Sequence, residues 1–343
     1  FIMIDFSAYF IILLISQLLI ILNFKKLSKY FNFFDIPDKV RKKHSNKTSL
    51  LGGSIIFFAL LFCIILFFIQ DTFIVNNQIF FKDKSSYIYF SISCFLMYVI
   101  GLVDDKYNLN YFVKIIFSGL IVIVFILFEK DIHIKIINLS FYVDTVDISK
   151  ISLLFTTFCF LLFINALNMF DGIDGQVGLY SLFLLNFILL LSGINHLIIF
   201  LMIGVCTFLY LNFKKRCFLG DSGTLLLGFI LSFLMIKLYN QNIIYHADKI
   251  FLIMIIPGLD MLRLFTERLS NKKNPFKGDN NHIHHLLQAK IGYYKALIYI
   301  QMLIVIPVIG SFYYNLLLIN FLSILIYFLT ITVLKKSKNR LSI

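Results

Sequence analysis

Charged residues are scarce in this chain: they make up 14% of its 343 residues, whereas 60% are hydrophobic and the mean hydropathy is +0.90. A soluble domain carries roughly 25% charged residues. The apolar residues also gather in runs of about 17–20, which is the length that crosses a bilayer as a helix. These features exclude an ordinary soluble domain and predict an all-α polytopic membrane protein, with residues 1–343 forming one integral-membrane domain.

Cysteine pairs and a cleavable leader are also missing. No CxxC pair occurs, and the five cysteines fall mostly inside apolar runs: Cys63, Cys94, Cys159, Cys206 and Cys217. This pattern favours small buried residues over disulfides or cysteine-bound metal. The first apolar run follows Asp5 rather than Lys or Arg, and no small-residue cleavage site comes after it. We therefore expect this run to be a retained span rather than a signal peptide.

Eleven apolar runs are predicted to be helical spans. They cover residues 6–24, 50–69, 87–103, 111–128, 151–167, 176–192, 196–213, 223–239, 249–265, 293–313 and 316–334. Most of the 31 Lys and Arg residues fall in the loops after the odd-numbered spans and in the tail after the last span. Because basic loops stay in the cytoplasm, the sequence predicts an amino terminus outside and a carboxyl terminus inside.

The formal net charge of +13 would suggest a nucleic-acid partner in a soluble protein. Here the basic residues lie between apolar spans, so membrane orientation and anionic headgroups explain them, and no nucleic-acid partner is expected. The outer segment 131–150 alternates apolar residues at Ile132, Ile134 and Ile136. This alternation predicts one small periplasmic β-hairpin.

Two polar clusters follow the first and third spans on the predicted cytoplasmic side. The first is a basic loop that leads to a glycine pair at a helix start: Arg41, Lys42, His44, Lys47, Gly52 and Gly53. Such a loop is often a membrane anchor, but glycines at a helix start also let backbone amides approach an anion. The second cluster is the pair Asp104 and Asp105 at a helix end. A divalent cation would relieve the repulsion between these carboxylates.

The third cluster repeats amides and carboxylates at a spacing of three: Asn165, Asn168, Asp171 and Asp174. In a continuous helix these four side chains would share one face, whereas Gly172 and Gly175 could instead break the helix and bring backbone close to a ligand. A polar helix cap is the alternative without function. So many polar groups at a membrane boundary are costly unless they bind something.

The last two clusters are a Gly-Asp-Ser-Gly segment around Asp221 and a long loop with three histidines, His282, His284 and His285. The histidine density suggests zinc, but no thiolate lies nearby, and we favour phosphate as the ligand. The isolated outer histidines, His133, His196 and His246, are expected to have no function. Carboxylates suit magnesium bound to a diphosphate, and basic residues suit phosphates, so the sequence indicates phosphoryl transfer at a membrane surface.

Together, these motifs resemble those of the polyprenyl-phosphate N-acetylhexosamine-1-phosphate transferases (glycosyltransferase family 4), in the WecA/TagO-like branch of the MraY superfamily. They are similar to the family's PDxRKxH…GG loop, aspartate pair, NxxNxxDGxDG, GDxG and HxHH segments. The resemblance runs from the first inner loop to His285 and includes the eleven-span topology. The MraY branch has a Glu after its histidines that is absent here, which disfavours a phospho-MurNAc-pentapeptide donor.

The resemblance implies an enzyme of the bacterial inner (plasma) membrane with its active site on the cytoplasmic face. It would transfer HexNAc-1-phosphate, by default GlcNAc-1-phosphate, from a UDP-sugar to undecaprenyl phosphate and release UMP. The product would start a cell-envelope glycan such as O-antigen, capsule or a teichoic-type polymer. The expected cofactor is Mg²⁺, with Mn²⁺ as an alternative, and a homodimer is compatible with the family.

The resemblance also implies roles for particular residues. Asp104, Asp105 and Asp221 would be catalytic, with Asp221 and Asp104 as metal ligands. Residues implied to bind the nucleotide or donor are Lys47, Asn165, Asn168, Asp171, Asp174, Phe218, His282, His284 and His285. Residues implied to bind the lipid phosphate are Arg41, Lys42 and His44.

Three positions depart from the family pattern. Ser49 stands where a Pro is usual, Asn46 replaces a Gly, and Asn280 follows the loop aspartate where a basic residue is common. The Asn280 change bears most on function, because the usual cation would contact donor phosphate; Lys277 or Arg268 are candidate substitutes.

Three other functions agree less well with these motifs. A transporter or channel would place charges near the bilayer midplane, whereas here nearly all acids lie at the inner edge. A CDP-alcohol phosphotransferase would carry a DGxxAR-type motif, which is absent after Asp171. An inactive relative would be consistent with Asn280 but not with the intact carboxylate motifs.

Overall fold

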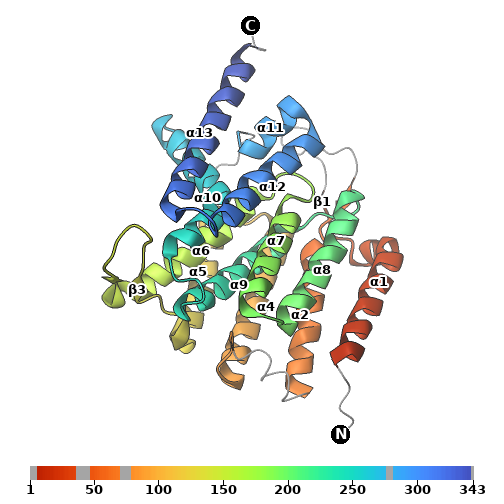
Figure 1. Cartoon of the computed structure of the whole chain (residues 1–343). Helices are drawn as coiled ribbons and strands as arrows, with labels where there is room; N and C mark the ends of the chain where they lie inside the picture. Colours follow the sequence, from red (N-terminus) through yellow and green to blue (C-terminus); the bar gives the residue numbers. More distant parts are fainter. Residues whose placement is uncertain (1–5, 36–46, 70–78, 276–280, 341–343) are drawn as a thin grey trace.

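The computed structural model describes residues 6–35, 47–69, 79–275 and 281–340, and most of them are helical (Figure 1). The helices are α1 (Phe6–Phe31), α2 (Gly52–Ile69), α4 (Lys84–Tyr107), α5 (Tyr111–Phe128), α6 (Ser152–Phe170), α7 (Gln176–Ser192), α8 (His196–Phe213), α9 (Gly220–Asn240), α10 (Ala247–Ser270), α11 (Ile283–Ile291), α12 (Tyr293–Gly310) and α13 (Leu316–Arg340). Each of the eleven predicted spans overlaps one of these helices. The predicted all-α class is therefore confirmed.

Nine of the described helices are long and apolar enough to cross a membrane. The other two long helices are α7, which has 17 residues, and α10, whose apolar sequence is interrupted by Asp260, Arg263 and Glu267. The chain is thus a multi-pass membrane protein. Several helices run past their apolar segment, as α1 does through Lys25 to Phe31, because basic side chains can reach the headgroup region without ending the helix.

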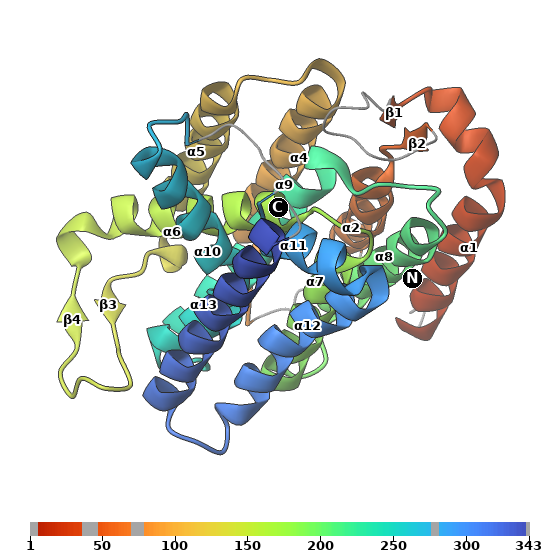
Figure 2. The same ribbon diagram turned by 90° about the horizontal axis from the view of Figure 1, so that it is seen from above.

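Helix α9 is the centre of the bundle. Every residue from Ser222 to Tyr239 is buried, and α2, α4, α6 and α7 all pack against α9. A helix that is buried on all sides has no lipid or solvent face, and its largely apolar sequence suits this interior position. Figure 2 shows α9 enclosed by these neighbours. Phe229 and Phe233 contribute most of its aromatic contacts, among them a stacked pair with Phe160 and an edge contact with Phe125.

Glycines let two neighbouring helices contact the first turn of α9 directly. A Cβ atom on Gly101 of α4 would lie 2.3 Å from the Cα of Ser222, and one on Gly53 of α2 would lie 2.4 Å from the amide nitrogen of Gly223. Only a residue without a Cβ permits such close backbone approach. Because Asp104 lies one turn after Gly101, this contact also sets how near the acidic end of α4 comes to α9.

The described residues also form two short antiparallel strand pairs. Strands β3 (Ile136–Ile137) and β4 (Val146–Asp147) pair with Ile136 opposite Asp147, which confirms the hairpin predicted in 131–150. Strands β1 (Phe34–Asp35) and β2 (Thr48–Ser49) also pair, and this second hairpin was not predicted. In Figure 1 the start of α1 and the end of α13 lie at opposite ends of the molecule.

Gly101→Ala is expected to lower the free energy of unfolding by about 2 kcal/mol, because its new methyl group meets helix backbone that cannot give way. The matched control is Gly258→Ala in α10, where no atom lies within 4 Å of the added carbon. Thermal unfolding in detergent can be followed with a thiol-reactive dye, since the buried thiols become accessible on unfolding: Cys63, Cys94 and Cys217. Equal melting temperatures for the two variants would contradict the close-contact account.

Candidate functional site

Two carboxylates from different helices converge on one lysine. The Lys114 Nζ atom, in the first turn of α5, lies 2.6 Å from an oxygen of Asp104 and 2.8 Å from an oxygen of Asp221. Asp104 lies in the last turn of α4 and Asp221 in the first turn of α9, so the ends of three helices meet here. The other Asp104 oxygen accepts a hydrogen bond from the Leu109 amide at 2.7 Å. The two predicted metal ligands therefore already surround a single positive charge.

Lys114 belongs to none of the polar clusters that the sequence indicated. A signal was present in the sequence. A lone lysine four residues into an otherwise apolar helix is expensive in a membrane, and such residues usually face a polar interior. Lys114 and Asp104 lie on two different helices, α5 and α4, so the sequence did not show that they pair.

Asp105 is adjacent to Asp104 but has a different environment. Its two carboxylate oxygens accept hydrogen bonds from the backbone amides of Asp221 at 2.7 Å and Ser222 at 3.0 Å. The carboxylate thus satisfies free amides at the amino end of α9, where the helix dipole favours negative charge. Gly220, at φ +71°, leaves room for it, since a Cβ there would lie 2.6 Å from an Asp105 oxygen. Asp105 therefore fixes the position of the Asp221 backbone.

The amides of the glycine pair after the first loop are bonded within the protein, which disfavours the alternative that they bind an anion. The Gly52 amide donates to the Phe218 carbonyl at 3.1 Å, and the Gly53 amide donates to the Leu219 carbonyl at 3.0 Å. The amides at this helix start donate their hydrogen bonds to carbonyl groups of the segment that leads into α9. The glycines serve close packing of backbone on backbone instead, as they do at Gly101.

Of the four polar residues spaced by three, only the first two lie on a helix. Asn168 donates through its amide nitrogen to an Asp221 oxygen at 2.5 Å and to the Thr224 hydroxyl at 2.8 Å. Asn165 points elsewhere: its amide nitrogen donates to the Leu161 carbonyl at 2.7 Å, and its oxygen accepts from the Tyr111 hydroxyl at 3.3 Å. Asn168 thus joins the Asp221 cluster, and Asn165 does not contact Asp221.

Helix α6 ends at Phe170, so Asp171 and Asp174 lie in the turn between α6 and α7. The possibility that the glycines break the helix is confirmed, with Gly175 at φ +78°. The turn is fixed by Asn212, whose oxygen accepts from the Gly175 amide at 2.5 Å and whose nitrogen donates to Asp174 at 3.3 Å.

Solvent reaches the Asp171 side chain, although protein atoms crowd it on several sides. This desolvation, together with the negative charges of Asp221, Asp174 and Asp105, raises the pKa of Asp171 from 3.8 to about 7. A carboxyl group with such a pKa changes its charge near neutral pH.

The segment that carries His282, His284 and His285, called the histidine segment below, packs against the 171–175 turn. A Cβ on Gly172 would lie 1.7 Å from the His284 Nε2 atom, so the imidazole occupies the space that any other side chain at 172 would fill. His284 is 1% exposed. Its pKa lies well below 6.5, mainly because of this burial and to a smaller extent because His285 and His282 are close. It is therefore a neutral ring. The ring centroid of His282 lies 5.2 Å from that of His284, and the Nδ1 atom of His282 lies 2.8 Å from an Asp260 oxygen.

Of the remaining predicted site residues, the structure describes Lys47, Phe218 and His285. Phe218 is half-buried and its amide donates to the Ser49 carbonyl at 2.8 Å, while Lys47 is exposed and His285 is half-buried. The predicted lipid-phosphate residues Arg41, Lys42 and His44 lie outside the described residues. So do two of the departures from the family pattern, Asn46 and Asn280, and the candidate substitute Lys277.

Two groups of side chains could hold a metal ion. Asp104 and Asp221 offer oxygens, the ligands that Mg²⁺ prefers, and their convergence on the Lys114 ammonium shows that the position favours a cation. The second group is Asp260, His282 and His284, whose ligand atoms lie within 4.8 Å of one another. In that group, however, Arg263 already donates to Asp260 at 2.8 Å, and its positive charge opposes a second cation.

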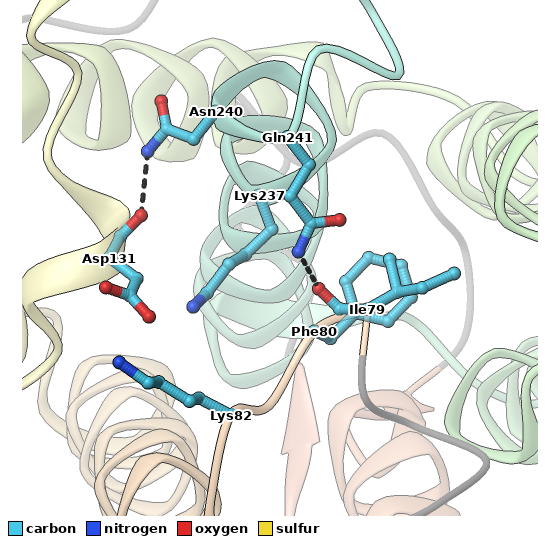
Figure 3. Close-up of a pocket in the computed structure, with 7 residues that line it drawn as sticks. All are labelled: Ile79, Phe80, Lys82, Asp131, Lys237, Asn240 and Gln241. Atoms are coloured by element: carbon cyan, nitrogen blue, oxygen red, sulfur yellow. Dashed lines mark hydrogen bonds between the residues drawn. The ribbon is translucent and has the colours of Figure 1, made fainter.

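A cavity of about 350 Å³ lies at the carboxyl end of α9, whereas Asp221 lies at its amino end (Figure 3). Its lining consists of Ile79, Phe80, Lys82, Asp131, Lys237, Asn240 and Gln241. Its polar groups are largely paired within the protein: Lys237 bonds Glu129 at 2.5 Å, and Asn240 donates to the Asp131 carbonyl at 2.8 Å. None of the predicted site residues that the structure describes lines this cavity.

Comparison with known proteins identifies relatives of this chain. Residues 87–239 match the family model described as glycosyl transferase family 4. A Thermotoga maritima protein named undecaprenyl-phosphate alpha-N-acetylglucosaminyl 1-phosphate transferase is 30% identical over 279 residues, which cover 79% of this chain and 78% of the relative. A Bacillus subtilis protein, named as a probable undecaprenyl-phosphate N-acetylglucosaminyl 1-phosphate transferase, is 26% identical over 84% of this chain and 78% of its own length. An Escherichia coli K12 protein with the same name as the Thermotoga one is 25% identical over 77% of this chain and 71% of its own.

Lys114→Met is expected to destabilise the metal-free protein by about 1–3 kcal/mol, because it leaves two carboxylates without their shared cation. Added Mg²⁺ should then raise the melting temperature more than in the unchanged protein, since the ion no longer competes with an ammonium group. The control is Lys106→Met, which removes an exposed lysine from the end of α4. Thermal unfolding with and without Mg²⁺ measures both effects, and an identical Mg²⁺ response in all three proteins would refute the shared cation position.

Proposed function

The chain belongs to glycosyl transferase family 4, and on this premise we propose that it transfers a HexNAc-1-phosphate from a UDP-sugar to undecaprenyl phosphate with release of UMP. The relatives are named for GlcNAc-1-phosphate transfer to this lipid phosphate, so UDP-GlcNAc is the proposed donor. The observation that carries the proposal is the meeting of Asp104, Lys114 and Asp221 at three helix ends. A clustered set of acidic groups around a cation suits a reaction between two phosphates.

Asp104 and Asp221 would hold Mg²⁺, with Mn²⁺ as an alternative. Their oxygens fit a hard divalent ion, and the Asn168 amide is bonded to the same Asp221 carboxylate, which fixes its orientation. When bound, the ion would supply positive charge to the donor diphosphate and thereby stabilise charge on the phosphoryl group in transfer.

The chain's own residues have distinct parts in the reaction. A lipid-phosphate oxygen attacks the β-phosphorus of the donor, forming one P–O bond as the bond from β-phosphorus to the bridging oxygen of UMP breaks. A phosphate monoester is largely ionised at neutral pH, with a second pKa of about 6, so Asp104 and Asp105 need not act as strong bases. Lys114 would stabilise the negative charge of the reacting phosphates, and Asp105 would hold the start of α9 in place.

The donor and lipid contacts complete the proposal. Residues proposed to form the donor site, by direct contact or by supporting the residues that make it, are Lys47, Asn165, Asn168, Asp171, Asp174, Phe218, His282, His284 and His285. Residues proposed to contact the lipid phosphate are Arg41, Lys42 and His44. Among these, His284 is supported as a scaffold for the 171–175 turn, since its ring packs on Gly172.

The distribution of charge supports an enzyme rather than a transporter. Within the nine candidate spans, the charged side chains that the structure describes lie in the first or last two turns of their helices, as Lys114 and Lys237 do. A transporter would place ionisable groups near the midplane. We propose an inner-membrane location with the amino terminus outside and the site on the cytoplasmic face, based on the basic residues in the loops beside it. The product would begin a cell-envelope glycan.

The proposal is tested by UMP release from the purified protein in detergent with Mg²⁺, undecaprenyl phosphate and a panel of UDP-HexNAc donors. Release should require the lipid and stop when a chelator is added. Asp221→Asn should lower the rate at least about 100-fold, because it removes charge from the metal ligand. The control is Asp144→Asn on the exposed outer hairpin, which should leave the rate unchanged.

Each outcome bears on a different part of this proposal. A folded protein that releases no UMP from any donor would overturn the transfer reaction. Full activity in Asp221→Asn would leave the reaction standing and refute the metal assignment.

The raised pKa of Asp171 predicts a pH dependence. The carboxylate form, which can accept hydrogen bonds from a nucleoside, is lost as pH falls through about 7. We expect kcat/KM for the UDP-sugar, at saturating lipid, to fall by up to roughly tenfold per pH unit below that value. Asp171→Asn should lower kcat/KM and remove this limb of the profile; an unchanged profile would show that Asp171 does not contact the donor in its charged form.

A further inference from the structure

A buried carboxylate on α10 organises the histidine segment. Asp260 is 2% exposed, and one of its oxygens, Oδ1, accepts hydrogen bonds from Arg263 at 2.8 Å, the Tyr327 hydroxyl at 2.9 Å and the Ile283 amide at 3.1 Å. The other oxygen, Oδ2, lies 2.8 Å from the Nδ1 atom of His282. No role was assigned to Asp260 by the sequence motifs.

We propose that Asp260 is a positioning residue that fixes His282 in one tautomer, with the proton on Nδ1 and with Nε2 available to the donor diphosphate. This inference rests on the proposed function for the identity of the ligand. The carboxylate cannot donate a proton while Arg263 is paired with it, so the hydrogen at the short Oδ2–Nδ1 contact belongs to the imidazole. Within the described parts of the chain Nε2 has no hydrogen-bond partner, and the side chain keeps 9% of its surface exposed.

The role of Nε2 follows from this arrangement. A neutral ring with its proton on Nδ1 has only a lone pair at Nε2, so it must take up a proton from solvent at Nε2 before it can donate there. The Asp260 carboxylate and an approaching negative group both stabilise the imidazolium that results. A diphosphate oxygen at Nε2 would then receive a charge-assisted hydrogen bond. The neighbouring ring, His284, is buried and neutral, so it adds no competing positive charge.

Metal binding by Asp260, His282 and His284 explains the contacts less well. Three protein donors already occupy Oδ1, and the Arg263 guanidinium gives Asp260 its positive partner. The Nδ1 atom of His284 lies 3.5 Å from the Gln176 amide nitrogen, so that atom accepts a hydrogen bond from Gln176 rather than coordinating an ion. A zinc ion would have to displace these bonds.

The same network ties the histidine segment to the last helix. Arg263 donates to the Tyr327 hydroxyl of α13 at 2.9 Å and to the Asn281 carbonyl at 2.8 Å. It also bonds Glu267 at 3.1 Å, and Glu267 in turn bonds Lys335 at 2.6 Å. Asp260 is therefore held rigidly by α10 and α13, which a residue that orients another side chain requires.

Asp260→Asn tests the tautomer directly. The three donors around Oδ1 hold the amide oxygen of Asn at that position, so its NH₂ group replaces Oδ2 and faces Nδ1 of His282. His282 must then accept at Nδ1 and carry its proton on Nε2, the reverse of the native tautomer. The shape of the site is unchanged. We expect kcat/KM for the UDP-sugar to fall about 100-fold with normal thermal stability of the fold.

The control is Asp248→Asn, which changes another buried aspartate at the outer end of the same helix, bonded to Ser140. Its activity should stay within about threefold of the unchanged protein. The second comparison introduces Asp260→Asn into a His282→Ala background. There it should lower kcat/KM for the UDP-sugar less than about threefold, because Asp260 no longer has a His282 side chain to orient.

Nitrogen-15 NMR of histidine-labelled protein in detergent reads the tautomer without any assay of activity. The His282 signals are assigned by their loss in His282→Ala; they should show a protonated Nδ1 in the unchanged protein and a protonated Nε2 in Asp260→Asn. The inference is overturned by a native tautomer in Asp260→Asn, by an undiminished loss of activity in the His282→Ala background, or by purified protein that carries zinc released by Asp260→Asn. If no UDP-sugar reacts, the proposed function fails while the NMR result still decides the pairing.

Discussion

The contact between the acidic end of α4 and the first turn of α9 is the constraint on which the rest of the structure depends. Asp105 accepts from two amides of α9, and Gly101 lies directly on the α9 backbone. A pair of aspartates at the carboxyl end of one helix is electrostatically unfavourable in isolation. Here the amino end of a second helix compensates for it, because the free amides and positive dipole of α9 meet the carboxylate of Asp105.

This contact explains why neighbouring carboxylates have different environments. Asp105 is committed to backbone amides, which leaves Asp104 to share Lys114 with Asp221. Removing charge from either partner would leave an unpaired group in a membrane protein, where the cost is high. The arrangement gives a polar site with a fixed geometry at the end of an apolar bundle, and α9 carries that geometry because it is buried along its whole length.

The histidine segment is attached to the site by packing as much as by charge. His284 fills the space above Gly172, and His282 is held by Asp260 of α10. The 171–175 turn, fixed by Asn212, is therefore covered by a segment more than a hundred residues away in the sequence. Two neighbouring histidines thus have separate surroundings: one ring is neutral and structural, and the other keeps an open nitrogen.

The sequence by itself determined the membrane class, the positions of the helices, the hairpin in 131–150 and most of the polar residues of the candidate site. It could do so because apolar length and polar clusters are local properties. The tertiary structure alone decided the partners: Lys114 between Asp104 and Asp221, Asp105 on the amides of α9, Asp260 on His282, and the glycine pair Gly52–Gly53 on backbone rather than on an anion. These pairings join residues that are distant along the chain, and a hydrogen bond depends on separations of a few ångströms that no residue spacing specifies.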